Sequence, residues 1–192
     1  AASLRDVMDS QSLCCDSPAI CWIDSGDYHY MSLFRTEKIG RPFQLLLIDN
    51  HPDMQEPMFS DVLSCGGWLR RLLETNPNLV NVVLVGVNPQ LMSETEGFDT
   101  RLSSSLLDDI PVFISIDKDA LNQDESRTNW DQGEMTVDSL EKTVADAAEG
   151  REVIGIDVCG EKPSSKGGDA EDMRINLNLN LRLQKFLKGL MA

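Results

Sequence analysis

Long apolar runs and basic side chains are both scarce in this sequence of 192 residues. No run approaches the roughly 18–20 consecutive apolar residues that a membrane-spanning helix needs, and the N-terminus shows no signal-peptide pattern. We therefore expect a cytoplasmic protein without a membrane partner. Lys and Arg number 17 against 32 Asp and Glu, which gives a formal net charge of −15. This charge argues against nucleic-acid binding, because a phosphate backbone would be repelled.

Paired cysteines and phosphate-binding glycine patterns are also missing. The sequence has no CxxC pair of the kind that binds structural zinc, and neither GxGxxG nor GxxxxGK[ST] occurs. An odd number of cysteines without a secretion signal predicts reduced thiols. They are Cys14, Cys15, Cys21, Cys65 and Cys159. The hydrophobic fraction of 41% indicates a globular chain, and the length favours one domain over residues 1–192.

What the sequence does contain is an alternation of apolar strand-like runs with helical patterns. The Leu- and Ile-rich run 43–48 is typical of a strand buried on both faces of a sheet. Four other runs predict strands: 19–23, 79–87, 111–116 and 153–158. Helices are expected at 63–73, from Thr136 to about Glu149 before Gly150, and in the tail from about 169 to 190. Strands alternating with helices predict an α/β fold, a three-layer α/β/α arrangement with a mainly parallel sheet.

Acidic and imidazole side chains follow three of these strands directly. They lie in the segments 26–29 (GDYH), 49–53 (DNHPD) and 117–119 (DKD). In open α/β sheets, functional groups collect in the loops beyond the carboxyl ends of the strands. Residues at i, i+2 and i+4 point the same way while the chain stays extended, so each segment can direct several ligands to one point.

Both histidines of the chain, His29 and His51, fall beside these acids. Four carboxylates form the tightest set with them, and Asp27 is a further acid that could take part. The four are Asp49, Asp53, Asp117 and Asp119. Such carboxylates would repel one another without cations, and mixed oxygen and imidazole ligation suits Mn²⁺, with Fe, Co or Zn as alternatives. The alternative to a metal site is a group of solvated loop acids, which buried strands leading into paired acids disfavour.

These motifs resemble a known family in order and approximate spacing, from about residue 19 to the end. Segment 49–53 resembles the DAHxD signature of the ureohydrolases, the arginase and agmatinase group, and 115–121 (SIDKDAL) resembles their SxDxDxxDP. Segment 26–29 resembles their GGDH with one residue inserted. Downstream, 133–136 (GEMT) resembles GGLT, and 156–163 (IDVCGEKP) resembles the strand that ends in ExNP.

The resemblance implies an arginase/deacetylase-like fold and a centre of two divalent ions, with manganese as the expected metal. One ion would be held by His29, Asp49, Asp53 and Asp117. The other would be held by Asp49, His51, Asp117 and Asp119. A hydroxide bridging the ions would attack a guanidino, amidine or amide carbon of a small-molecule substrate. Asp53 would pass the proton to the leaving nitrogen, and Glu161 is the second candidate catalytic residue.

The chain departs from the family where substrate is recognised. Gly160 aligns with the substrate-facing Glu of ExNP, and Glu161 follows one place later, where a surface ion pair with Lys162 or Lys166 is its alternative role. Segment 64–67 (SCGG) occupies the region of a family histidine. No further histidine is left to activate Cys65 as a nucleophile, so Cys65 is expected to be a small buried residue.

Three functions stay open at this point. The first is a binuclear-metal hydrolase of linear C–N bonds. The second is an arginase-like metal-binding protein without turnover, serving as a binding or regulatory module. The third is a deacetylase of the single-zinc type, which Asp53 disfavours because that group usually lacks the third acid of DxHxD. The sequence also leaves a homo-oligomer open.

Overall fold

The computed structural model describes residues 19–57 and 62–191, so Cys14 and Cys15 lie outside the described residues. Six parallel strands form one sheet in the order β1-β6-β5-β2-β3-β4. The strands are β1 (Ile20–Trp22), β2 (Phe43–Ile48), β3 (Leu79–Val85), β4 (Leu102–Ser103), β5 (Val112–Asp117) and β6 (Val153–Cys159).

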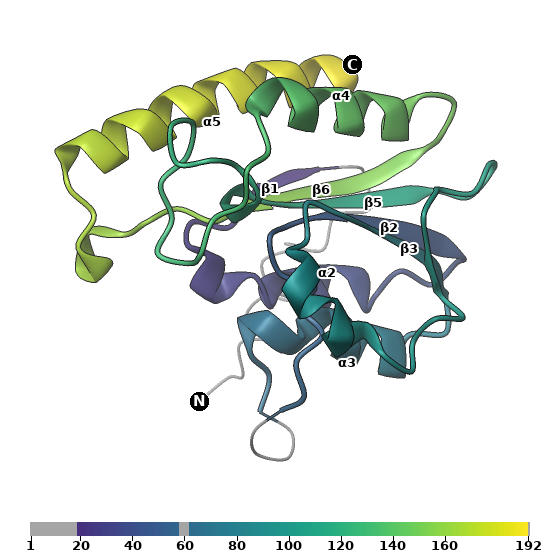
Figure 1. Cartoon of the computed structure of the whole chain (residues 1–192). Helices are drawn as coiled ribbons and strands as arrows, with labels where there is room; N and C mark the ends of the chain where they lie inside the picture. Colours follow the sequence, from purple (N-terminus) through teal and green to yellow (C-terminus); the bar gives the residue numbers. More distant parts are fainter. Residues whose placement is uncertain (1–18, 58–61, 192) are drawn as a thin grey trace, which may run out of the picture.

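Helices cover both faces of this sheet (Figure 1). The helices α2 (Met31–Thr36) and α3 (Trp68–Thr75) lie on one face, and α4 (Val137–Ala148) and α5 (Ala170–Leu190) lie on the other. The predicted three-layer α/β/α fold with a parallel sheet is therefore confirmed.

Alternate side chains of β2 pack against the helices on opposite faces of the sheet. Leu46 and Ile48 pack in the core beneath α4 and α5, whereas Leu45 and Leu47 pack in the core beneath α2 and α3. All six residues of β2 are buried, because both faces of the strand are covered. The continuous apolar run in the sequence reflects this double burial.

The ends of the elements show which local signals were informative. Gly150 follows α4 with φ +70°, as expected. Of the two candidate caps, Thr136 and Asp138, it is Thr136 that caps the helix by accepting a hydrogen bond from the Ser139 amide. The helix predicted at 63–73 begins only at Trp68, after a 3₁₀ turn (η2, Cys65–Gly67). Neither α2 nor the two-residue β4 was predicted.

The structure also bears on the state of the cysteines and on membrane-spanning helices. Cys21, Cys65 and Cys159 are free thiols. Among residues 19–57 and 62–191, no helix combines the length and apolar character needed to cross a bilayer.

Candidate metal centre

Three loops at the carboxyl edge of the sheet carry the predicted site residues. Behind β1, a 3₁₀ turn (η1, Gly26–Tyr28) ends at His29, and Ser25 caps this turn by accepting a hydrogen bond from the Asp27 amide. Asp49, His51 and Asp53 follow β2, whereas Asp117 ends β5 and Asp119 lies in the next turn. β2 and β5 are neighbouring strands and only β6 separates β5 from β1, so all three loops open at the same edge of the parallel sheet.

His29 occupies the centre of one half of the cluster. Its Nδ1 lies 3.2 Å from Asp49 Oδ2, 3.0 Å from Asp53 Oδ2 and 3.4 Å from Asp117 Oδ2. Its Nε2 lies 2.8 Å from Ser115 Oγ, a contact that fixes the orientation of the ring. The imidazole is 2% exposed, so Nδ1 meets acidic oxygens rather than water.

His51 gathers the other half of the cluster. Its Nδ1 lies 2.9 Å from Asp119 Oδ2 and 3.5 Å from Asp49 Oδ1. Asp49 thus faces both imidazoles, one with each carboxylate oxygen. Its Oδ2 is buried and accepts no hydrogen bond, so this oxygen has unused ligand capacity.

The loop backbones hold the carboxylates in place. The amides of Asn50 and Asp119 donate to Asp119 Oδ1 and Asp117 Oδ1 at 3.0 and 2.9 Å. The indole N–H of Trp68 donates to Asp53 Oδ2 at 2.5 Å. Asp53 has φ +51°, a left-handed conformation that Asp tolerates better than most residues.

Burial is the largest influence on the titration of the four acids. It raises the pKa values of Asp49, Asp53 and Asp117, with neighbouring carboxylates adding to the effect. Burial and the charge of Asp49 raise the pKa of Asp119 to about 7. The hydrogen bond to Asp119 is the main cause that raises the pKa of His51 to about 11. Without bound cations, these raised pKa values mean that the acids tend to hold protons, which lessen their mutual repulsion.

A cavity of about 130 Å³ opens onto the six predicted metal ligands. The other lining residues that the structure describes are uncharged: Gly26, Gln55, Ser64, Cys65, Gly66 and Trp130. Trp130, from the loop that follows β5, forms part of this wall. Cys65, which was expected to be buried, also lines the cavity and is only partly buried.

Asp27 stands apart from the cluster. Its Oδ1 accepts hydrogen bonds from Asn129 Nδ2 and Trp130 Nε1, both at 3.0 Å, and its Oδ2 lies 3.4 Å from Lys166 Nζ. Asp27 therefore holds the loop that carries Trp130, and its suggested part in metal ligation is not supported.

Glu161 is likewise not brought to the cavity. Its Oε1 accepts hydrogen bonds from Lys118 Nζ at 2.9 Å and Asn180 Nδ2 at 2.6 Å, so neither Lys162 nor Lys166 is its partner. Lys118 is only 1% exposed, and its aliphatic stem and ammonium fill space behind the turn that carries Asp117 and Asp119. These contacts do not support the expected catalytic role of Glu161.

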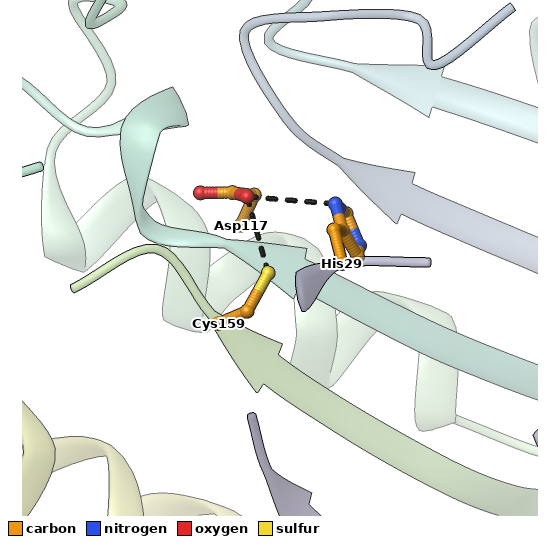
Figure 2. Close-up of side chains that lie close together, drawn as sticks. All are labelled: His29, Asp117 and Cys159. Carbon is orange, nitrogen blue, oxygen red and sulfur yellow. Dashed lines mark hydrogen bonds and ion pairs between the residues drawn. The ribbon is translucent and has the colours of Figure 1, made fainter. Parts of the chain in front are cut away.

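Two residues that contact the cluster were missed as site residues in the sequence. Cys159 Sγ lies 3.1 Å from Asp117 Oδ2, and Figure 2 shows it beside His29 and Asp117. The other is Trp68, which is fully buried and donates to Asp53 Oδ2. A signal for Cys159 did exist, since it ends the strand next to Asp117.

Comparisons with known proteins give the fold a wider setting. No protein-family profile matches the sequence. An uncharacterised protein of Thermotoga maritima is 34% identical over 167 residues, which cover 83% of this chain and 65% of that protein. The chain thus spans slightly less than two thirds of the length of this relative.

The same fold occurs in several solved structures. A putative agmatinase from Clostridium difficile has a TM-score of 0.72 at 13% identity, covering 100% of this chain and 76% of that one. The formimidoylglutamase from Bacillus subtilis has a TM-score of 0.66 at 16% identity, covering 96% and 65%. At these identities the likeness concerns the fold. The chain has the arginase-like α/β fold that ureohydrolases share.

Proposed function

We propose that this protein binds two divalent metal ions and hydrolyses a linear C–N bond in a small molecule. The observation that carries the proposal is the convergence of two imidazoles and four carboxylates, all but one of these side chains at most 6% exposed, on one cavity. The partly buried member is His51.

The donor set fits such ions on chemical grounds. Four buried carboxylates carry four negative charges, which two divalent cations would balance. Asp49 Oδ2, buried and without a hydrogen bond, is an oxygen that a cation would satisfy. Oxygen and imidazole donors together suit Mn²⁺ and the neighbouring first-row metals.

Two overlapping groups of ligand atoms would hold the ions. His29, Asp49 and Asp53 form one group and Asp49, His51 and Asp119 form the other, with the ligand atoms of each group within 4.8 Å of one another. Asp117 joins the first group through its contact with His29 and approaches the second through the Asp119 amide. When bound, a pair of divalent ions lowers the pKa of a shared water and polarises the bond to be cleaved.

Asp53 is the candidate for proton transfer. It lines the cavity, while Trp68 fixes its Oδ2 and leaves the carboxyl group in a single orientation. In our proposal, this carboxyl group takes a proton from the attacking water and delivers it to the leaving nitrogen. The low exposure of Asp53 keeps bulk water away from that proton.

The remaining cavity wall favours an uncharged substrate group. With the four acids balanced by cations, the other described lining residues offer amide, hydroxyl, thiol and indole groups and no charge. A guanidinium would lack an anionic partner there, since the Glu161 carboxylate is bound to Lys118. An amide or a neutral amidine therefore fits this wall better.

A metal-binding role without turnover is the second candidate. It is favoured by the engagement of Glu161 with Lys118 and by the absence of a third histidine from the sequence. The same metal centre would then support binding or regulation.

Release of ammonia or urea from guanidino and N-acyl compounds, measured with added Mn²⁺, separates the two candidates. We expect metal-dependent release that Asp53→Asn lowers by about 100-fold or more, the usual range for a lost general acid–base group. Asp99→Asn, at an exposed position, is the matched control and should retain activity. Metal binding without release from any compound would favour the second candidate.

A metal count tests the centre itself. Asp117→Ala should abolish binding of both ions, because Asp117 is proposed to contact each of them. Metal content after dialysis against Mn²⁺ measures this directly. Two ions retained per chain in the variant would refute the shared role of Asp117.

A further inference from the structure

Cys159 is a thiol placed among metal-ligand atoms. It is the last residue of β6 and pairs in register with Asp117, the last residue of β5. The two side chains are therefore neighbours at the carboxyl edge of the sheet. The Sγ atom, an Asp117 carboxylate oxygen and a His29 ring nitrogen lie within 4.8 Å of one another (Figure 2).

The surroundings of this thiol are unlike those of an ordinary core cysteine. Cys159 is 1% exposed, yet its Sγ donates a hydrogen bond to Asp117 Oδ2 at 3.1 Å. The same oxygen lies 3.4 Å from His29 Nδ1. A buried free cysteine usually behaves as a small hydrophobe, whereas this thiol contacts a carboxylate among the proposed metal ligands.

A second observation points to a ligand at this position. Asp49 Oδ2, 1% exposed as a residue, accepts no hydrogen bond and lies 3.2 Å from the same His29 Nδ1. His29 Nδ1 is thus flanked by one oxygen with unused capacity and by another that the thiol contacts. A cation coordinated by His29 Nδ1 would lie next to both of these oxygens.

We propose that Cys159 is a thiolate ligand of the ion held by His29 and Asp117, which makes the two ion positions chemically different. The proposal rests on the metal centre proposed above and deepens it. On binding, the Sγ–H proton passes to solvent and a metal–sulfur bond forms, with no change of oxidation state. A thiolate favours Zn²⁺, Fe²⁺ or Co²⁺ over Mn²⁺ at this position. The position formed by Asp49, His51 and Asp119 keeps oxygen and nitrogen donors alone.

Cobalt(II) is a suitable probe because a thiolate ligand adds near-ultraviolet charge-transfer absorption to the visible bands of the ion. We expect both features when the metal-free protein is titrated with Co²⁺. Cys159→Ser should lose the near-ultraviolet absorption and keep visible bands. Cys65→Ser is the matched control, since it removes the thiol that lines the cavity, and it should retain both.

A variant in which Cys159 is the sole cysteine keeps the test valid if Cys159→Ser does not fold. Near-ultraviolet absorption in this variant would support the proposal. Visible bands without near-ultraviolet absorption in the wild type would overturn the thiolate ligand and leave the metal centre standing. No cobalt bands at all would overturn the centre as well.

Competition between Zn²⁺ and Mn²⁺ gives an independent readout. Loss of outer contacts to ligands typically lowers metal affinity by about 10- to 100-fold, so losing a direct thiolate should reduce the preference for Zn²⁺ by about 10-fold or more. An unchanged Zn²⁺/Mn²⁺ preference in Cys159→Ser would contradict the proposal.

Discussion

At the scale of single residues, Gly160 couples the backbone to the position of Asp117. Its φ is +100°, and a Cβ at this position would lie only 2.2 Å from Asp117 Oδ1 and 2.7 Å from the Lys118 amide nitrogen. A side chain here is therefore excluded both by conformation and by the carboxylate itself. Gly160, which aligns with the Glu of ExNP, therefore has to be glycine as long as the Asp117 carboxylate keeps its position.

Gly160→Ala should therefore be more harmful than a glycine substitution that only strains the backbone. Gly97 is the matched control, because its φ is +87° and nothing lies within 4 Å of its Cβ position. We expect Gly97→Ala to lower the free energy of unfolding by about 1 kcal/mol, the usual effect of left-handed backbone strain. Gly160→Ala should lose more and should also weaken metal binding, as measured by urea unfolding and Mn²⁺ titration. Equal losses in the two variants would contradict the proposed clash.

The limits of sequence reasoning are clear at this same scale. The two acidic motifs identified five of the six ligand candidates, because alternate residues of an extended segment share a direction. Cys159 was missed because its importance depends on the register of β6 against β5, a pairing between segments 42 positions apart. Glu161 was expected to take part in catalysis, but its carboxylate is bound to Lys118. The sequence contained no sign of this ion pair, because Lys118 lies in the middle of an acidic motif and is nevertheless buried.

At the scale of whole elements, the buried strands could be predicted and the short edge elements could not. Double burial gives β2 its continuous apolar run, whereas β4 has two residues and α2 has six, too few to show a period. The tail could be read as strand or helix, since Leu residues recur there at both spacings. It forms α5, with Leu179, Leu183 and Leu187 buried against the sheet.

A capping box at Asp169 helps to fix where α5 begins. The Asp169 carboxylate accepts from the Asp172 amide at 2.8 Å, and Asp172 Oδ2 accepts from the Asp169 amide at 3.3 Å. Asp169→Ala should lower the free energy of unfolding by about 1 kcal/mol, the typical value for a lost N-cap. Chemical denaturation measures this change, and Asp99→Ala, at an exposed position, should leave stability nearly unchanged. A loss of equal size in both variants would rule out the capping role.

The start of α5 should also show a defined pH dependence. The hydrogen bond from Lys162 Nζ, 2.8 Å from Asp172 Oδ2, is the main cause that lowers the pKa of Asp172 in the folded protein. A lowered folded-state pKa adds stability above the unfolded value of about 4, and this stability is lost as the pH falls through the folded pKa.

Comparison of the wild type with Asp172→Asn isolates that contribution. The wild type should be the more stable protein near pH 6, and the difference should shrink as the pH falls below about 4. Unfolding curves across this range provide the measurement. A difference that stays constant with pH would mean that the Asp172 charge does not contribute.

At the scale of the whole molecule, the proposed metal centre would tie the stability of the fold to metal binding. The proposed ligands come from the ends of β2 and β5 and from the turn after β1, so an ion bound there would join segments that are far apart in the chain. Without cations, the buried carboxylates disfavour one another. An ion that binds the folded chain and not the unfolded one must therefore stabilise the molecule.

Thermal unfolding with and without metal tests this coupling. At a free metal concentration 100 times Kd, one site contributes about 2.7 kcal/mol, and each kcal/mol shifts the Tm of a chain of this size by about 2–4 °C. We therefore expect added Mn²⁺ or Zn²⁺ to raise the Tm by roughly 5–10 °C for each occupied site, and a chelator to reverse the rise. Asp117→Ala should lose this response, whereas Asp99→Ala should keep it. An equal response in both variants would place the stabilising ion elsewhere, because only Asp117 among the two lies at the point where the strand ends meet.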